Sequence, residues 1–335
     1  MVISMNAKSE IPLTNRSVDH SHQRGVPRGL LWWGVLLVVI VVIILLFLAD
    51  RILTYMITVD EIVSHLHIVR NLRLFLMYES GVEELLIYNP ATHRWLEQVR
   101  VLDVTIPLNS RDFEFDPTTG LLWLVSEAGL LEERGKINGA RSLPISGRCL
   151  FLERSSSDLS KLFLTLQKPD DSWELVEYDL DTQSERHVLT FSAMPIAVLC
   201  QGNTEVIYLD SAGDLYKFSS NQLSVLHNFG DFVRTDIRQI YLLRYDDQQV
   251  CLILRDQIYL ISTSSGAMNE LNELQTPVRS PIIINLEPRI PVKYLFYLSG
   301  RRDGRVQVRN VDESGRDTLL ANIREKPLSL ELYKQ

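Results

Sequence analysis

The feature that most constrains the fold is a strand-and-turn unit that recurs along most of the chain. In the clearest copy, "KLFLTLQKPDDSWELVEYD" (Lys161 to Asp179), two apolar strands flank a polar turn, the pattern typical of a β-hairpin. The last turn residues before the middle strand of each unit are Gly81, Gly120, Asp171, Asp214, Asp256 and Gly304. They are separated by 39, 51, 43, 42 and 48 residues.

A mean interval of about 45 residues matches the period of a propeller blade, a four-stranded sheet repeated around an axis. Apolar segments between the units, such as "PIAVLC", "IRQIYLLR" and "PIIINLE", supply the remaining strand. The C-terminal "PLSLELYK" is expected to close the ring as the innermost strand of the first blade, because an open row of sheets exposes its edges. The sequence therefore predicts an all-β, six-bladed β-propeller over residues 70–335, with a pair of β-sandwiches as the alternative.

One segment carries a family resemblance. "ELVEYDLDTQSERHVLT" (Glu174 to Thr190) resembles the end of a blade in TolB-like propellers, where a strand with "Y-D-L-D" is followed by a short turn and "L-T". From about residue 70 to 335 the pattern of blades is similar to the TolB-like and WD40-like β-propeller repeat families. The resemblance implies the same propeller architecture.

A second feature precedes the repeats. Residues 30–49 read "LLWWGVLLVVIVVIILLFLA" and contain no charge. As a helix this segment would be roughly 30 Å long, the thickness of a bilayer core. A cleaved signal peptide is the main alternative, but the apolar run is longer than a signal h-region and "FLAD" lacks the small-residue cleavage pattern. A buried helix of a soluble protein is the other. We predict a transmembrane helix that acts as a retained signal anchor.

The flanking charges predict the orientation of this helix. Lys8, Arg16, Arg24 and Arg28 precede it, whereas Arg51 is the only Lys or Arg in the twenty residues after it. By the positive-inside rule, residues 1–29 form a cytoplasmic tail, expected to be disordered, and residues 50–69 connect the helix to a propeller on the periplasmic or exterior side.

Aromatic and basic residues at the start of the apolar run are expected to lie at the membrane surface. We predict that Trp32, Trp33 and Arg28 are interface anchors at the cytoplasmic side, since aromatic side chains collect at that level of the bilayer. Residues 30–49 are then the part of the chain that contacts lipid.

The net charge limits the choice of partners. The chain carries −8 overall, but the first 29 residues carry +2 and the part after the apolar run carries −10. An acidic body repels the phosphates of nucleic acids. We therefore expect no nucleic-acid partner.

Motifs for chemistry are missing from the sequence. It has no nucleophile elbow, zinc-protease motif or phosphate-binding glycine loop, so we predict no catalytic, cofactor-binding or metal-binding residues and no enzyme activity. Cys149, Cys200 and Cys251 are evenly spaced but do not match the blade register, which favours buried apolar cysteines over a metal site. The loop from Asp179 to Glu185 lacks the glycine and the distal glutamate of a calcium loop. We interpret it as a β-turn with Asx-type hydrogen bonds, and we interpret the loop from Asp210 to Asp214 in the same way.

One basic segment stands out in the acidic body. "SGRRDGRVQVRN" (Ser299 to Asn310) contains Arg301, Arg302, Arg305 and Arg309. These arginines could dock an acidic partner or a lipid head group. The alternative is a solvated hairpin turn with internal salt bridges.

Together these features favour an interaction protein. We expect a single-pass, membrane-anchored propeller that acts as a scaffold subunit of a membrane or envelope complex, with other membrane or envelope proteins as partners. The alternative is a small-molecule sensor or enzyme that uses the central channel of the propeller. A third hypothesis, that the anchor helix carries the function, finds no small-residue packing motif in its support.

Overall fold

The computed structural model describes thirteen segments of the chain. They are residues 36–49, 72–89, 94–136, 139–155, 157–201, 205–230, 240–271, 273–274, 278–285, 293–299, 304–311, 318–323 and 326–334. The chain divides into two units, Met1–Tyr55 and Met56–Gln335, and all the described strands belong to the second.

The described strands form six four-stranded antiparallel sheets. Blades 1 and 2, written from the inner to the outer strand, are β24 (Ser329–Lys334), β1 (Leu72–Tyr78), β2 (Gly81–Asn89) and β3 (Arg94–Asp103), then β4 (Asp112–Asp116), β5 (Leu121–Val125), β6 (Leu131–Gly135) and β7 (Gly139–Ser142). Blades 3 and 4 are β8 (Arg148–Arg154), β9 (Lys161–Gln167), β10 (Trp173–Asp179) and β11 (Ser184–Phe191), then β12 (Pro195–Gln201), β13 (Glu205–Asp210), β14 (Asp214–Ser219) and β15 (Gln222–Asn228). Blades 5 and 6 are β16 (Ile240–Arg244), β17 (Gln249–Leu254), β18 (Gln257–Ser262) and β19 (Met268–Glu270), then β20 (Val278–Asn285), β21 (Lys293–Ser299), β22 (Gly304–Asn310) and β23 (Thr318–Ile323).

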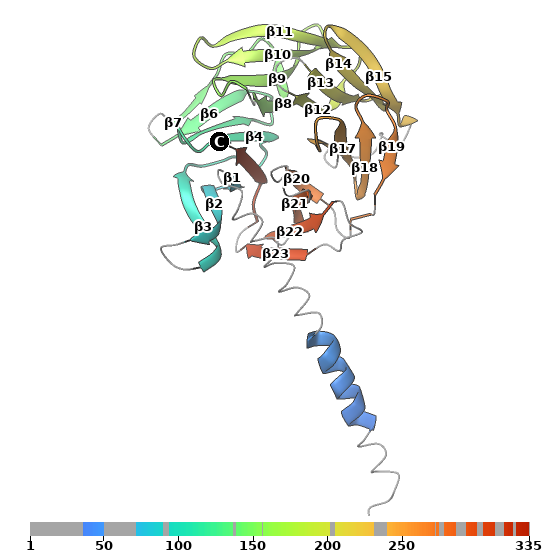
Figure 1. The fold of residues 1–335 in the computed structure, drawn as a ribbon. Helices are drawn as coiled ribbons and strands as arrows, with labels where there is room; N and C mark the ends of the chain where they lie inside the picture. The colour runs from blue at the N-terminus through green and yellow to red at the C-terminus, as the bar shows by residue number, and fades with distance from the viewer. Residues whose placement is uncertain are drawn as a thin grey trace, which may run out of the picture. The chain divides into compact units, whose positions relative to one another are not determined.

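The six sheets lie around a common centre (Figure 1), which confirms the six-bladed propeller and excludes a pair of β-sandwiches. The predicted closure is confirmed as well, because β24 from the C-terminus pairs with β1 and becomes the inner strand of blade 1. In this antiparallel pair Leu74 lies opposite Leu332, and Leu76 lies opposite Leu330. The last strand of the chain therefore completes the first blade.

The packing between blades follows from the alternation of side chains along each strand. On β1, Leu74 and Leu76 pack against blade 6, whereas Phe75 and Met77 pack against blade 2. Six clusters of buried apolar side chains result, one for each pair of neighbouring blades. Every blade thus buries both faces, and the core of the propeller is a ring of interfaces.

The structure corrects the register that the sequence predicts for blade 2. Gly120 lies between β4 and β5, the first and second strands of the blade. The other five predicted turn residues lie just before the third strand of their blade or are its first residue. The equivalent turn of blade 2 contains Gly129, which changes the intervals of 39 and 51 residues to 48 and 42. The two hairpins of this blade have the same apolar and polar pattern, so periodicity alone did not distinguish them.

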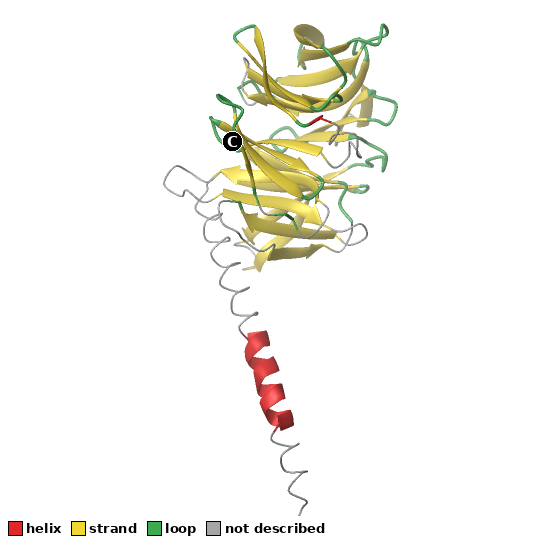
Figure 2. Cartoon of the chain, turned by 90° about the vertical axis from the view of Figure 1, so that its right-hand side faces the viewer, coloured by secondary structure: helices red, strands yellow, loops and turns green. Residues whose placement is uncertain are grey.

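Residues 36–49 form a helix (red in Figure 2), which covers part of the predicted span at 30–49. Within the described segments, no helix combines the length and the hydrophobicity needed to cross a membrane. The predicted tail (1–29) and connector (50–69) lie outside the described residues.

Candidate functional site

A pocket of about 460 Å³ lies at the end of the ring where the inner strands begin. Blades 1, 2 and 6 contribute to it, together with the segment that leads into β24. The described residues that line it are Tyr78, Glu79, Leu108, Ser110, Phe113, Arg279, Lys326 and Leu328.

Backbone hydrogen bonds hold the walls of the pocket in place. Leu328 N donates to the carbonyl oxygen of Met77 at 2.7 Å, and Ile106 N donates to that of Glu79 at 2.8 Å. The first bond ties the C-terminal segment to β1, and the second ties the loop between β3 and β4 to the turn after β1. The pocket is therefore a direct product of ring closure.

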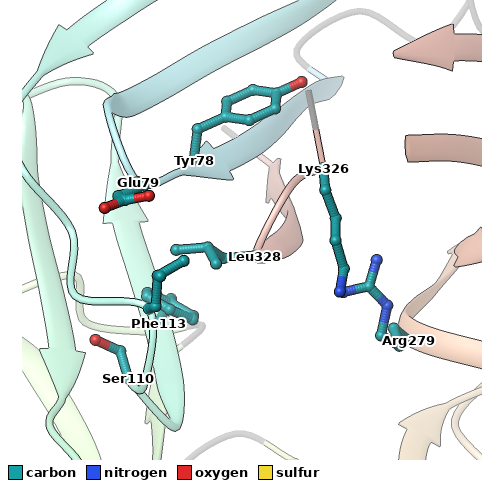
Figure 3. A pocket seen from close by; sticks show the side chains of 8 residues that line it. Tyr78, Glu79, Ser110, Phe113, Arg279, Lys326 and Leu328 are labelled. Carbon is teal, nitrogen blue, oxygen red and sulfur yellow. The ribbon is translucent and has the colours of Figure 1, made fainter. Parts of the chain in front are cut away.

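The charges of the pocket are separated in space. Figure 3 shows Arg279 and Lys326 on one side and Glu79 and Ser110 on the other, with Leu328 between them. Nη1 of Arg279 lies 3.5 Å from the carbonyl oxygen of Pro327. The other two nitrogens of this guanidinium, Nε and Nη2, are buried and have no hydrogen-bond partner among the described residues.

Burial lowers the pKa of Arg279, but an arginine stays protonated in a protein. A buried cation without a full set of acceptors is costly. Among the described residues, the guanidinium of Arg279 therefore has fewer acceptors than donors.

A second polar feature lies along the inner strands. Four half-buried acidic side chains, which we call the inner-edge carboxylates, lie on three inner strands. They are Asp112 and Glu114 on β4, Glu153 on β8 and Glu331 on β24. Asp112 accepts a hydrogen bond from Leu152 N at 2.9 Å, and Glu114 accepts one from Arg154 N at 3.1 Å.

The same arrangement recurs one blade further, where Glu153 accepts a hydrogen bond from Cys200 N at 2.8 Å. In each case a carboxylate of one blade binds a backbone amide on the inner edge of the next blade. An inner strand has no sheet partner on that edge, so its amides need another acceptor. These carboxylates therefore join neighbouring blades.

The environment raises the pKa of these carboxyl groups. Burial raises the pKa of Asp112 and of Glu114 to about 7, although backbone hydrogen bonds oppose the shift. Burial raises the pKa of Glu153 to about 8, and it also raises that of Glu331, where the nearby Glu114 and Asp112 add to the effect. Desolvation and mutual repulsion both disfavour the ionised forms.

The predicted arginine patch is only partly available at the surface. Arg305 is exposed on β22, but Arg309 is 6% exposed, and its Nη1 donates to the carbonyl oxygen of Glu273 at 3.0 Å. Arg309 therefore supports the packing of blade 6 beside blade 5 and does not present a docking surface. Arg301 and Arg302 lie outside the described residues, as do the predicted interface anchors Arg28, Trp32 and Trp33.

The structure confirms the predicted Asx turns and the burial of two of the three cysteines. Cys149 and Cys251 are buried and Cys200 is half-buried, on β8, β17 and β12 at positions that are not equivalent. Asp179 accepts a hydrogen bond from Asp181 N at 3.1 Å, and Asp210 accepts one from Ala212 N at 2.9 Å. In both, the donor lies two residues after the aspartate, as Asx turns require. The described segments contain no group of three His, Cys, Asp or Glu that could hold a metal.

Sequence reasoning missed both the pocket and the inner-edge carboxylates. Arg279 and Pro327 are 48 residues apart, and no local pattern connects them. A weak signal for the carboxylates exists in "DFEFD" (Asp112–Asp116), where acidic residues alternate with phenylalanines on a strand that must have two covered faces.

Comparison with known proteins yields a structural match. No protein-family model matches the chain, and no curated protein matches its sequence. Among solved structures, TolB from Acinetobacter baumannii is similar with a TM-score of 0.51 and 11% sequence identity, over 79% of this chain and 66% of the TolB chain, just under two thirds of its length. The resemblance to TolB-like propellers predicted from the blade pattern is thus confirmed for the fold.

Proposed function

We propose that this chain is a non-enzymatic interaction subunit of an envelope protein complex, held at the non-cytoplasmic face of a membrane by residues 30–49. The observation that carries the proposal is the closed six-bladed propeller with the fold of TolB. A closed propeller is a rigid platform whose loops and outer strands can vary without loss of the core. The uncharged segment 30–49 and the basic residues before it support the anchor and its orientation.

The roles of the inner-edge carboxylates also support a scaffold. Asp112, Glu114 and Glu153 accept backbone hydrogen bonds across blade boundaries. Their carboxylates thus have a structural use at the inner edge of the ring. This use accounts for acidic residues near the centre without assigning them to catalysis.

An outer strand offers a candidate contact surface. Leu223 and Val225, on β15 at the outer edge of blade 4, are 46% and 58% exposed. Met268, on the outer strand of blade 5, is 41% exposed. Exposed apolar side chains on an edge strand are typical of a surface that contacts a partner.

The experiment is site-specific photocrosslinking in native membranes. A photoreactive residue at position 225 is expected to give a discrete crosslinked species that co-purifies in mild detergent. The same residue at Gln183, an exposed turn position of blade 3, serves as the control and should give none. A chain that elutes alone after crosslinking at positions 223, 225 and 268 would contradict the interaction role.

A further inference from the structure

We propose that β15, the outer strand of blade 4, pairs with β15 of a second copy of this chain about a two-fold axis and joins two propellers edge to edge. This step rests on the proposed function, because it names the partner of the contact surface given there. The charge, the exposure and the register of β15 support it.

The outer edge of β15 is unprotected. The strand lies at the rim of the ring (Figure 1), and among the described strands only β14 pairs with it. Edge strands are usually protected by charged side chains, by Pro or by a short length. β15 has seven residues, and none of them is Lys, Arg, Asp, Glu or Pro. Its residues Leu223 and Val225 are 46% and 58% exposed, so this edge is open to another strand.

The other outer strands differ from β15. Charged residues occur in β3, β7, β11 and β19, and β7 and β19 have only four and three residues. β23 also contains no charged residue, but of its side chains the structure describes only Ile323, which is 7% exposed. Among the described side chains, β15 therefore presents the uncharged and apolar outer edge.

The turn before β15 determines which backbone groups of the strand point outward. The two turn residues, 220–221, have φ angles of 53° and 61°, as in a type I′ turn. Such a turn is closed by a backbone hydrogen bond between its flanking residues, Ser219 and Gln222, which lie opposite each other. Hydrogen-bonded and non-hydrogen-bonded pairs then alternate along the ladder. The N–H and C=O groups of Leu223 and Val225 therefore point away from β14.

A two-fold axis at Ser224 gives these outward groups partners. Leu223 of each copy then lies opposite Val225 of the other copy, and each such pair exchanges both of its backbone hydrogen bonds. A two-fold contact uses the same surface on both chains. A charged residue close to the axis would therefore meet a like charge, which is destabilising across a strand pair. In β15 the residue at the axis is an uncharged serine.

The same register brings apolar side chains together. Leu223 and Val225 lie opposite Phe218 and Tyr216 of β14, which pack against the cluster between blades 3 and 4. Directly opposed residues lie on the same face of a sheet. The Leu223 and Val225 side chains of both copies therefore gather on that face, and the apolar row continues from one propeller to the other.

The test is disulfide trapping of the purified full chain in a mild detergent. In the proposed register the Cα atoms of the two Ser224 residues are about 4.5 Å apart, within the range of a disulfide. Under mild oxidation Ser224→Cys should give at least about tenfold more disulfide-linked dimer than the native chain, because pairing raises the effective concentration of the two thiols. Ser142→Cys, at an exposed position of the outer strand β7, is the matched control and should stay at the level of the native chain. Equal yields from the two variants would overturn the proposal.

Two further cysteine variants test the register. Leu223→Cys and Val225→Cys chains should form a disulfide when they are mixed, since these positions are opposed and their Cα atoms are about 5.5 Å apart. In either variant alone, the two cysteines are displaced by two residues along the strands, beyond the reach of a disulfide, and the yield should be several-fold lower. Equal yields from the mixture and from the separate variants would reject this pairing.

A lysine on the edge should prevent the pairing. In the Ser224→Cys chain, Val225→Lys should lower the yield of dimer about tenfold, because a charged side chain protects an edge strand. Leu130→Lys, which changes a 50% exposed leucine just before β6, is the matched control and should leave the yield unchanged. Thermal unfolding checks that both variants fold as the native chain does. Equal yields from these variants would show that the contact does not involve β15.

Failure of this proposal can be distinguished from failure of the proposed function by photocrosslinking at position 225 in native membranes. A product of twice the mass of the chain is expected if β15 binds a second copy. A product with a different protein, together with no Ser224→Cys dimer, would reject self-pairing and retain the interaction role. A Ser224→Cys dimer, together with no product of any other mass at positions 223, 225 and 268, would support self-pairing and contradict a complex with other proteins.

Discussion

Nη2 of Arg154 lies 2.9 Å from Oδ2 of Asp116, and this ion pair joins blade 3 to blade 2 with side chains that are 9% and 4% exposed. Although burial alone raises the pKa of Asp116, hydrogen bonds from Arg154, Thr118 and Thr119 outweigh it and lower the pKa to about 2. The guanidinium of Arg154 also lies over the ring of Trp123, 5.4 Å from its centroid. The pair therefore connects β4 and β8, the inner strands of blades 2 and 3.

Removal of one partner of this ion pair should destabilise the propeller. Asp116→Asn removes the charged partner in the ion pair of the buried Arg154 guanidinium, and we expect a loss of about 3–5 kcal/mol in the free energy of unfolding. Urea unfolding followed by tryptophan fluorescence measures it. Asp247→Asn breaks the exposed pair between Arg244 and Asp247, whose side chains are 48% and 88% exposed, and should cause no measurable loss. Equal effects of the two changes would contradict a structural role for the buried pair.

The inner-edge carboxylates should make the propeller less stable as the pH rises. The pKa values of Asp112, Glu114 and Glu153 are raised from ordinary values of 3.8, 4.5 and 4.5 to about 7, 7 and 8. The folded state therefore binds more protons than the unfolded state between about pH 4 and 8. The stabilisation is complete below the unfolded pKa values and is lost as the pH passes through the folded values.

Unfolding measured in urea from pH 5 to pH 9 checks this dependence. Glu153→Gln, which cannot ionise, should flatten the upper part of the profile by an amount on the order of 1 kcal/mol, since solvent screening reduces the effect at half-buried groups. A native chain whose stability increases over this pH range would show that the carboxylates are ionised at little cost.

Ring closure by β24 should be essential for a stable propeller. Leu330 is 2% exposed and packs in the interface between blades 1 and 6. Leu330→Asp places a charge in that interface and should lower the free energy of unfolding by about 4 kcal/mol. Because β24 then pairs less stably with β1, the inner edge of β1 becomes available for association with another chain. Size-exclusion chromatography with light scattering should show larger species. Leu223→Asp on the exposed outer strand β15 should give no species larger than those of the native chain and should leave the stability unchanged, and similar behaviour of both variants would argue against closure as the cause.

The turn after β1 requires glycine at position 81. Gly81 has φ +136°, and a Cβ atom there would lie 2.1 Å from the carbonyl oxygen of Leu102. Gly81→Ala should therefore cost several kcal/mol, because backbone strain and a clash add. Gly120 has φ +68° with open space around the Cβ position, so Gly120→Ala should cost only about 1 kcal/mol. Thermal unfolding of the two variants distinguishes a steric requirement from the loss of backbone freedom alone.

The sequence by itself predicted the number of blades, the hairpins of five of them and the closure of the ring, with a pair of β-sandwiches as the alternative. The hairpins follow from local patterns, since turn residues and alternating apolar positions extend over only a few residues. The closure follows because "PLSLELYK" was left over after the other strands had been assigned to blades. The predicted register of blade 2 was wrong because two successive hairpins have the same local pattern. Only packing against blades 1 and 3 decides which strand of blade 2 is innermost.

Tertiary structure alone decided the environment of the charged groups. Arg309 reads as a surface arginine in the sequence, but the approach of blade 5 buries it. Arg279, Lys326 and Glu79 share a pocket because ring closure brings the first and last blades together. The distance between such groups depends on the whole ring, whereas sequence periodicity describes only neighbours along a strand. The pocket could therefore not be predicted from the sequence.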